Sequence, residues 1–175
     1  MAVSLLLLEL ETKSFAPKGD CSIPGFEGHI VIDSFSWDFS NVTKIEGKNM
    51  ARALKLGKVK FAKSYDRSST SLCKLMEQDT SKNGPHFLRA TFKFVDPTGN
   101  HGSNPNANMD SIMELELTDG FIDEISIKVA EESKVVSVKE DITFSFKTAV
   151  AIRYNIKSPT GRRTAVPEFL YVFPT

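Results

Sequence analysis

The sequence predicts a mainly β protein, a compact antiparallel β barrel or sandwich of about eight to ten strands in one domain over residues 1–175. Apolar and polar residues alternate in several short segments, which are separated by Gly, Pro, Asn and Asp. Only one segment, over about residues 69–79, has the spacing of a helix, and we expect this short helix to flank the strands. The 13 Phe residues suit a sheet-rich core, because aromatic side chains are enriched in strands.

The first two predicted strands cover residues 3–10 and 28–39. We expect the middle of the first strand to be buried on both faces. In the second strand the apolar side chains change face near Asp33, because Ile30 and Ile32 share one face and the other face carries Phe35, Trp37 and Phe39. This change indicates either a bulge or a strand that exchanges one packing partner for another.

Residues 40–56 are predicted to form a long extended loop, since they show no consistent period. A loop of this length in a compact domain usually has a function or is disordered. In the strand that follows, over 58–63, Val59 and Phe61 alternate with lysines that we assign to a solvated face.

The predicted helix buries a stripe formed by Leu72, Leu75 and Met76, which lie three and four residues apart. Ser69, or Ser68 beside it, is the expected N-cap, because a serine hydroxyl accepts a hydrogen bond from the free amides of the first turn.

The second half of the chain contains the remaining predicted strands, over 86–95, 113–117, 121–129, 142–146, 150–156 and 169–173. Segment 150–156 either continues the strand before it or forms a new one. Residues 97–110 are expected to form a surface loop, and Asp119-Gly120 a tight hairpin turn. With such a turn, Leu117 faces Ile122, which is out of phase with Ile125, so we expect a bulge at Asp123-Glu124. Residues 131–134 are expected to form a charged turn.

Charge and composition exclude several classes of function. The chain has 22 basic and 22 acidic residues of mixed order, which argues against a nucleic-acid-binding face. No segment approaches the length of a membrane span, so we expect no membrane insertion. The apolar start lacks the basic region of a signal peptide, so cytoplasmic synthesis and any secretion without a signal peptide are expected. Cys21 and Cys73 are expected to be free thiols.

No residue pattern indicates an enzyme, a metal site or a bound cofactor. The three His residues are far apart in sequence and lack a second ligand at metal-binding spacing. Glu114 and Glu116 share a strand face, but that face is the solvated one, where nothing apolar would raise the pKa of either carboxyl. The serines of 68–71 are not surrounded by a nucleophile elbow.

The order of motifs resembles the hemolysin-coregulated protein family, the inner-tube proteins of the type VI secretion system. That family carries a strand reading roughly Ile-x-Val-x-Ser-Phe-Ser-Trp-Gly, to which residues 30–37 are similar. Its Asp-Lys-x-Ser-Pro-x-Leu helix start resembles residues 66–72, and its Glu-x-Val-x-Leu-x-Phe strand resembles 140–146. Its early turn and its aromatic end are similar to Gly19-Asp20-Cys21 and to Tyr154, Gly161 and 168–173.

The resemblance implies a structural subunit that forms homo-hexameric rings, which stack into a tube and are expelled by a contractile sheath. The implied partners are further rings, the tip (spike) protein, the sheath, and effector proteins carried in the ring lumen. We expect the 40–56 loop to reach the neighbouring ring, because it is too long for a simple connector. The residues expected at subunit or ring interfaces are Trp37, Phe39, Asn41, Lys44, Ile45, Lys48, Asn49, Met50 and Asp66.

Two alternative functions remain open at the level of sequence. One is a tail-tube-like protein of a phage-derived particle, which would meet the same physical demands. The other is a monomeric β barrel that binds a small apolar ligand, which requires an interior larger than its side chains fill. The many Phe residues favour a filled interior.

Overall fold

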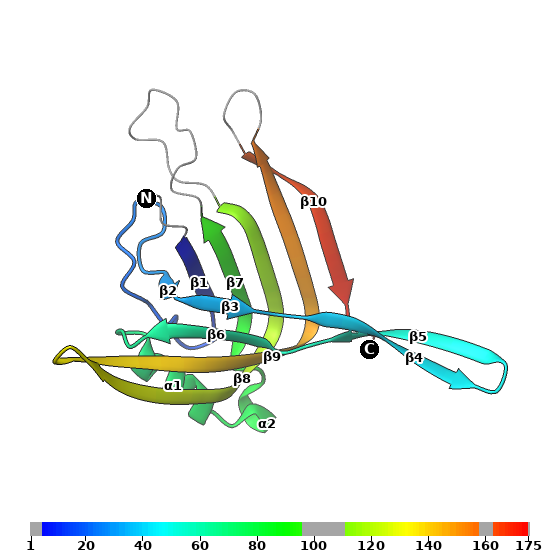
Figure 1. Ribbon diagram of the computed structural model, residues 1–175, viewed down its shortest axis with the longest axis horizontal. Coiled ribbons are helices and arrows are strands. Elements are labelled where there is room, and N and C mark those ends of the chain that lie inside the picture. Colours follow the sequence, from blue (N-terminus) through cyan, green and yellow to red (C-terminus); the bar gives the residue numbers. More distant parts are fainter. Residues whose placement is uncertain (1–4, 96–110, 158–162, 175) are drawn as a thin grey trace.

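The computed structural model describes residues 5–95, 111–157 and 163–174 (Figure 1). The surface loop predicted over 97–110, and Gly161 of the family-like C-terminal segment, lie outside the described residues. The chain is mainly β, as predicted, and the strand pairs of the described residues are antiparallel. The strands are β1 (Leu5–Glu11), β2 (Ile30–Ile32), β3 (Ser34–Ser36), β4 (Phe39–Glu46), β5 (Asn49–Leu56), β6 (Val59–Ser64), β7 (Phe87–Val95), β8 (Ser111–Glu132), β9 (Val135–Lys157) and β10 (Arg163–Val172).

The predicted helix over about 69–79 is divided into two in the structure. Helix α1 covers Ser69–Glu77 and buries Leu72 and Leu75, and α2 covers Thr80–Asn83. Asp79 caps α2 by accepting a hydrogen bond from the Ser81 amide at 3.0 Å.

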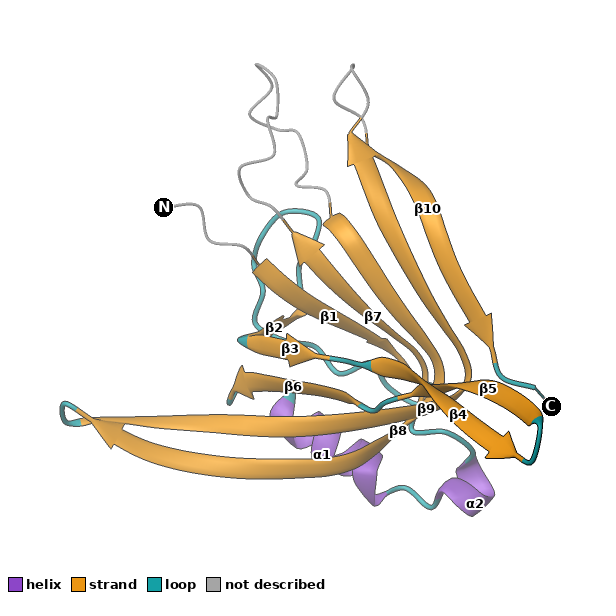
Figure 2. Cartoon of the chain, turned by 45° about the vertical axis from the view of Figure 1, so that its right-hand side comes forward, coloured by secondary structure: helices purple, strands orange, loops and turns teal. Residues whose placement is uncertain are grey.

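The main sheet has the order β2-β1-β7-β8-β9-β6-β3, with β10 paired to β9. Its two ends are neighbours in sequence, since β2 pairs with β1 and β3 pairs with β6 on either side of Asp33. The strand predicted over 28–39 therefore does exchange partners at Asp33, which explains the change of face. The result is sandwich-like and is not a hydrogen-bonded closed barrel (Figure 2).

The long strands β8 and β9 pass through both layers of this sandwich. In one layer, residues 111–120 of β8 pair with β7, and residues 149–157 of β9 pair with β10. In the other layer, residues 139–144 of β9 pair with β6. The parts of β8 and β9 nearest their connecting turn are called their outer halves. The predicted hairpin turn at Asp119-Gly120 is wrong, because β8 continues through it with a shift of register between Thr118 and Gly120. Asp119 has a φ of 53°, and the strand bends here from one layer to the other.

Two other predictions, for a bulge in β8 and for the turn between β8 and β9, are confirmed. A second register shift lies between Ile122 and Glu124, where a bulge was expected. The charged turn is at Ser133-Lys134, and both residues have positive φ, which matches the twist of the flanking strands.

The core lies between the two layers and is filled by aromatic side chains. Phe61, Phe92 and Phe144 contact one another, and Phe87 packs on Phe144 with ring centroids 4.8 Å apart. Leu7 and Leu8 in β1 are both fully buried, as predicted for a strand covered on both faces. The interior is therefore packed with side chains, against the expectation for a barrel that holds a small ligand.

Candidate functional site: a projecting hairpin and its base

Residues 39–56 form a two-stranded β hairpin, which we call the arm, and the prediction of a loop is wrong. Strands β4 and β5 pair in register from Phe39–Leu56 to Glu46–Asn49 around a turn at Gly47, whose φ is 63°. The arm projects from one end of the molecule in both views (Figures 1 and 2). All eight residues of β4 and most of β5 are exposed.

Most of the predicted interface residues lie on this arm. Ile45 and Met50 are cross-strand partners near the tip, and their side chains are 72% and 65% exposed. The arm also carries Asn41, Asn49 and one acidic residue, Glu46, against four basic residues, Lys44, Lys48, Arg52 and Lys55. The tip of the arm therefore presents an exposed apolar pair among basic residues.

The base of the arm is fixed by Trp37 and Gly57. The Trp37 indole Nε1 donates a hydrogen bond to the Gly57 carbonyl at 3.1 Å, and the Gly57 amide donates to the Asp38 carbonyl at 2.8 Å. A side chain at Gly57 would lie 2.6 Å from that carbonyl, so the close approach requires glycine. Phe39 lies between Trp37 and Phe169 of β10, with ring centroids 5.0 Å and 5.9 Å away.

Asp66 and Ser69, two further predicted site residues, lie elsewhere, in a buried polar network at the start of α1. Ser69 is not the N-cap: Ser68 occupies that position and makes no side-chain capping bond. The Ser69 hydroxyl accepts from the Asp66 amide at 3.1 Å and donates to Glu140 Oε2 at 2.7 Å. The Asp66 side chain is only 11% exposed and accepts hydrogen bonds from Lys63 and Ser68.

The sequence reasoning missed the centre of this network, which is an ion pair between Lys63 and Glu140. Both side chains are fully buried, and Lys63 Nζ lies 2.7 Å from Glu140 Oε2. Lys63 was assigned to a solvated face, although it is in phase with Val59 and Phe61, and Glu140 is in phase with Ile142. That phase was the signal that could have revealed the pair.

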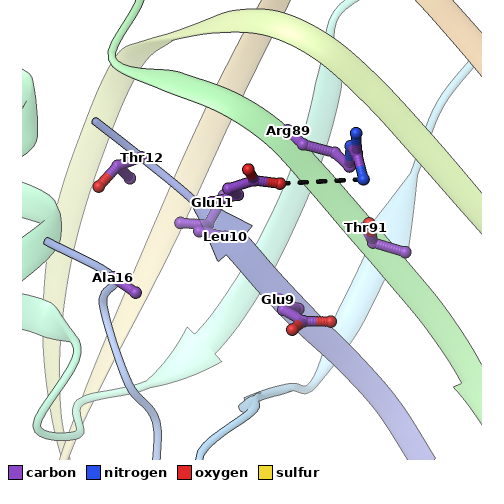
Figure 3. Close-up of a pocket in the computed structure, with 7 residues that line it drawn as sticks. All are labelled: Glu9, Leu10, Glu11, Thr12, Ala16, Arg89 and Thr91. Carbon is purple, nitrogen blue, oxygen red and sulfur yellow. Dashed lines mark ion pairs between the residues drawn. The ribbon is translucent and has the colours of Figure 1, made fainter. Parts of the chain in front are cut away.

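A ladder of alternating charges crosses the outer face of five adjacent strands. Arg89 of β7 lies 3.8 Å from Glu11 of β1 and 3.8 Å from Glu116 of β8. Arg153 of β9 lies 3.4 Å from Glu116 and 3.1 Å from Glu168 of β10. Figure 3 shows the Glu11–Arg89 pair at the edge of an open pocket of about 350 Å³. The face of β8 that was predicted to be solvated thus carries charged side chains, and these form ion pairs with side chains of the neighbouring strands.

Next to this ladder, Lys93 joins Glu9 to His29. Lys93 Nζ lies 2.9 Å from Glu9 Oε2 and 3.0 Å from His29 Nε2. The hydrogen bond from Lys93 lowers the pKa of the Glu9 carboxyl, and burial opposes this only in part. The stability gained is therefore present above the pKa of the unfolded chain and is lost as the pH falls. Because Glu9 is half-exposed, this contribution is small.

The described residues contain no group of three or more His, Cys, Asp and Glu side chains arranged to hold a metal ion. Within the same ranges, no helix is long and apolar enough to span a membrane.

By its fold, the chain is one of the antiparallel β sandwiches known from type VI secretion structures. A structure described as a type six secretion system protein aligns with a TM-score of 0.73 and 12% identity, covering 97% of this chain and 96% of that chain. Hcp1 from Salmonella typhimurium aligns with a TM-score of 0.67 and 17% identity, covering 99% and 96%. A sheath-tube complex of the extracellular contractile injection system PVC aligns with a TM-score of 0.51 and 10% identity, covering 85% and 88%.

The sequence itself gives the family. The family described as type VI secretion system effector, Hcp, matches residues 8–154, which is most of the chain. The chain therefore belongs to the Hcp family, and the resemblance seen in its motifs is confirmed. A search of curated protein sequences found no match.

Proposed function

We propose that this protein is a tube subunit of a type VI secretion system, in which six copies form a ring and the rings stack through the arm. Membership of the Hcp family supports the type of apparatus. The structural likeness to a chain of a sheath-tube complex supports a tube as the assembly and a contractile sheath as its partner. The tip protein and effectors held in the ring lumen complete the proposed set of partners.

The observation that carries this proposal is the exposed arm. Val42, Ile45 and Met50 project from a ribbon that no other strand covers among the described residues. An isolated two-stranded hairpin is marginally stable in water, so a long one is best explained by a partner that it meets on assembly. A second copy is that partner, since a stacked ring presents the same surface to every arm.

The test replaces the apolar tip by charge in the variant Ile45→Asp/Met50→Asp. Both side chains are exposed, so the free energy of unfolding should change by less than about 0.5 kcal/mol per site. We expect hexamers to persist in light scattering and stacked tubes to disappear from electron micrographs. Deletion of the tip, residues 45–50, should give the same result.

The conservative variant Ile45→Val/Met50→Leu is the matched control and should still form tubes, because it keeps the tip apolar. The proposal is wrong if the charged variant stacks as well as the control. It is also wrong if deletion of the tip destroys the hexamer, because the arm would then belong to the ring and not to the contact between rings.

A tail-tube-like subunit of a phage-derived particle would be built on the same contacts, and the secretion family match favours the first assignment.

A further inference from the structure

An aromatic cluster lies where the arm meets the rest of the molecule. It consists of Trp37, just before the arm, Phe39, the first residue of the arm, and Phe169 of β10, and we call it the base clamp. The rings of Phe39 and Phe169 are nearly parallel, with an interplanar angle of 16° and centroids 5.9 Å apart. Phe169 thus brings β10 into contact with the start of the arm. Figure 1 shows the end of β10 close to the base of β4 and β5.

Apart from the base clamp, few contacts among the described residues fix the orientation of the arm relative to the sandwich. Within the part of the chain that the structure describes, strands β4 and β5 form a separate two-stranded sheet and pair only with each other. Leu56 packs against the core at the end of β5, and the bonds of Gly57 tie the two ends of the arm together. A ribbon held at its base by so few groups can pivot there, because hinge motion needs only a few backbone torsions to change.

Phe169 is well placed to stop this pivoting because β10 is fixed on both sides of it. Phe169 is the register partner of Ile152 in β9, and the preceding Glu168 forms an ion pair with Arg153 at 3.1 Å. After it, Tyr171 packs against the core, and Phe173 lies on Phe146 with centroids 5.7 Å apart. The clamp therefore joins the arm to a strand that is paired with β9 and packed against the core.

We propose that Phe169 is a positioning residue, which sets the direction of the arm by stacking on Phe39. This inference rests on the proposed function, in which the arm meets the next ring. A contact repeated around a ring requires every arm to point the same way, so a free arm would lose orientational entropy on stacking. By holding the arm in place before assembly, the base clamp lowers that cost.

The direct test measures the arm in the full-length protein by distances between two spin labels. One label is placed on the arm tip as Lys48→Cys, and the other on the native, exposed Cys73 of α1. Cys21 is buried and is shielded from the reagent in the folded protein. In Phe169→Ala, we expect the distance distribution to become at least about twofold wider, because the stack that restrains the hairpin is gone.

Three further variants make the test specific. Phe39→Ala removes the other ring of the stack and should widen the distribution in the same way, so the result does not depend on Phe169→Ala folding. Phe169→Tyr keeps the stack and should keep the distribution narrow. Leu170→Ala changes the neighbouring residue, whose side chain points to the opposite face of β10, and should also leave it narrow. An unchanged distribution in both alanine variants overturns the inference.

The same variants link arm direction to assembly. We expect the fraction of protein that pellets as tubes to fall about fivefold in Phe169→Ala, which corresponds to the loss of one aromatic pair, while ring formation is unchanged. A wide distribution with normal pelleting would overturn the positioning role and leave the proposed function intact. If the charged tip variant also pellets normally, the proposed function itself fails.

Discussion

Lys63 and Glu140 are the two residues on which the junction of α1 with the sheet depends. The Lys63 ammonium meets Glu140, Asp66 and Ser69 within 2.9 Å, and it also donates to the Ser64 carbonyl at 3.1 Å. Glu140 Oε1 has no hydrogen-bond partner among the described residues, so the polar contacts of this carboxyl group are made through Oε2. Buried charges are costly unless they are paired, and this network keeps a lysine and two carboxylates beneath the helix start.

Removal of one charge from this pair should strongly destabilise the fold. Lys63→Met leaves Glu140 buried without its cation, and we expect a loss of about 3–5 kcal/mol in the free energy of unfolding, measured with urea. The double variant Lys63→Met/Glu140→Gln removes both charges and should recover most of the loss. Lys58→Ala, which breaks an exposed pair with Asp123, is the control and should have little effect. Equal stability of Lys63→Met and the control would contradict this account.

At the residue scale, the sequence predicted the apolar core better than the polar one. Val59, Phe61 and Leu72 were placed correctly, because apolar residues with a clear period are buried by the hydrophobic effect alone. Ser69 was placed at the helix cap because its type and position suit one. The competing hydrogen bond to Glu140 spans 71 residues, and such pairing cannot be deduced from local sequence.

Among the elements, β8 shows how one residue directs a long strand. Gly120 sits where β8 bends, and its Cα faces the ring of Phe87 and the carbonyl of Ser145. Sequence reasoning placed a hairpin turn here because Asp-Gly is a strong turn signal. The structure has a positive φ at Asp119, but it belongs to a bulge within a continuous strand, since residues on both sides pair with β9.

We therefore expect Gly120→Ala to destabilise the protein by about 1–3 kcal/mol in urea unfolding, because the added methyl overlaps the Phe87 ring in a packed core. Gly47→Asn is the control: open space surrounds Gly47, and Asn tolerates the positive φ of that position. The bend account predicts that Phe87→Leu costs less in the Gly120→Ala background than in the wild type. Additive effects of the two substitutions would contradict it.

The arm was predicted as an element of unusual length but not as a hairpin, and the reason is physical. Strand periodicity in sequence comes from burying one face, and the arm buries neither face within its own chain. Without that constraint, its polar and apolar residues follow no period. The assembly proposal explains why residues 39–56 lack a hydrophobic period. In that proposal the arm is buried by another copy of the chain and not by its own core.

At the scale of the whole molecule, the chain is a packed sandwich whose two long hairpins project from it, the arm at one end and the outer half of β8 and β9 at the other (Figure 2). Exposed apolar side chains gather on both, with Ile127, Val129 and Val136 near the β8–β9 tip. A ring closes through two different surfaces on each copy, whereas stacking uses the two sides of the ring. The two projecting hairpins therefore offer separate exposed apolar side chains for the two kinds of contact.

The most direct test of the central claim is electron cryo-microscopy of the concentrated wild-type protein. The account predicts rings with six-fold symmetry that stack into tubes, with residues 45–50 of each arm buried against the neighbouring ring. Tubes in which those residues remain exposed to solvent, or a protein that stays monomeric at every concentration examined, would contradict it.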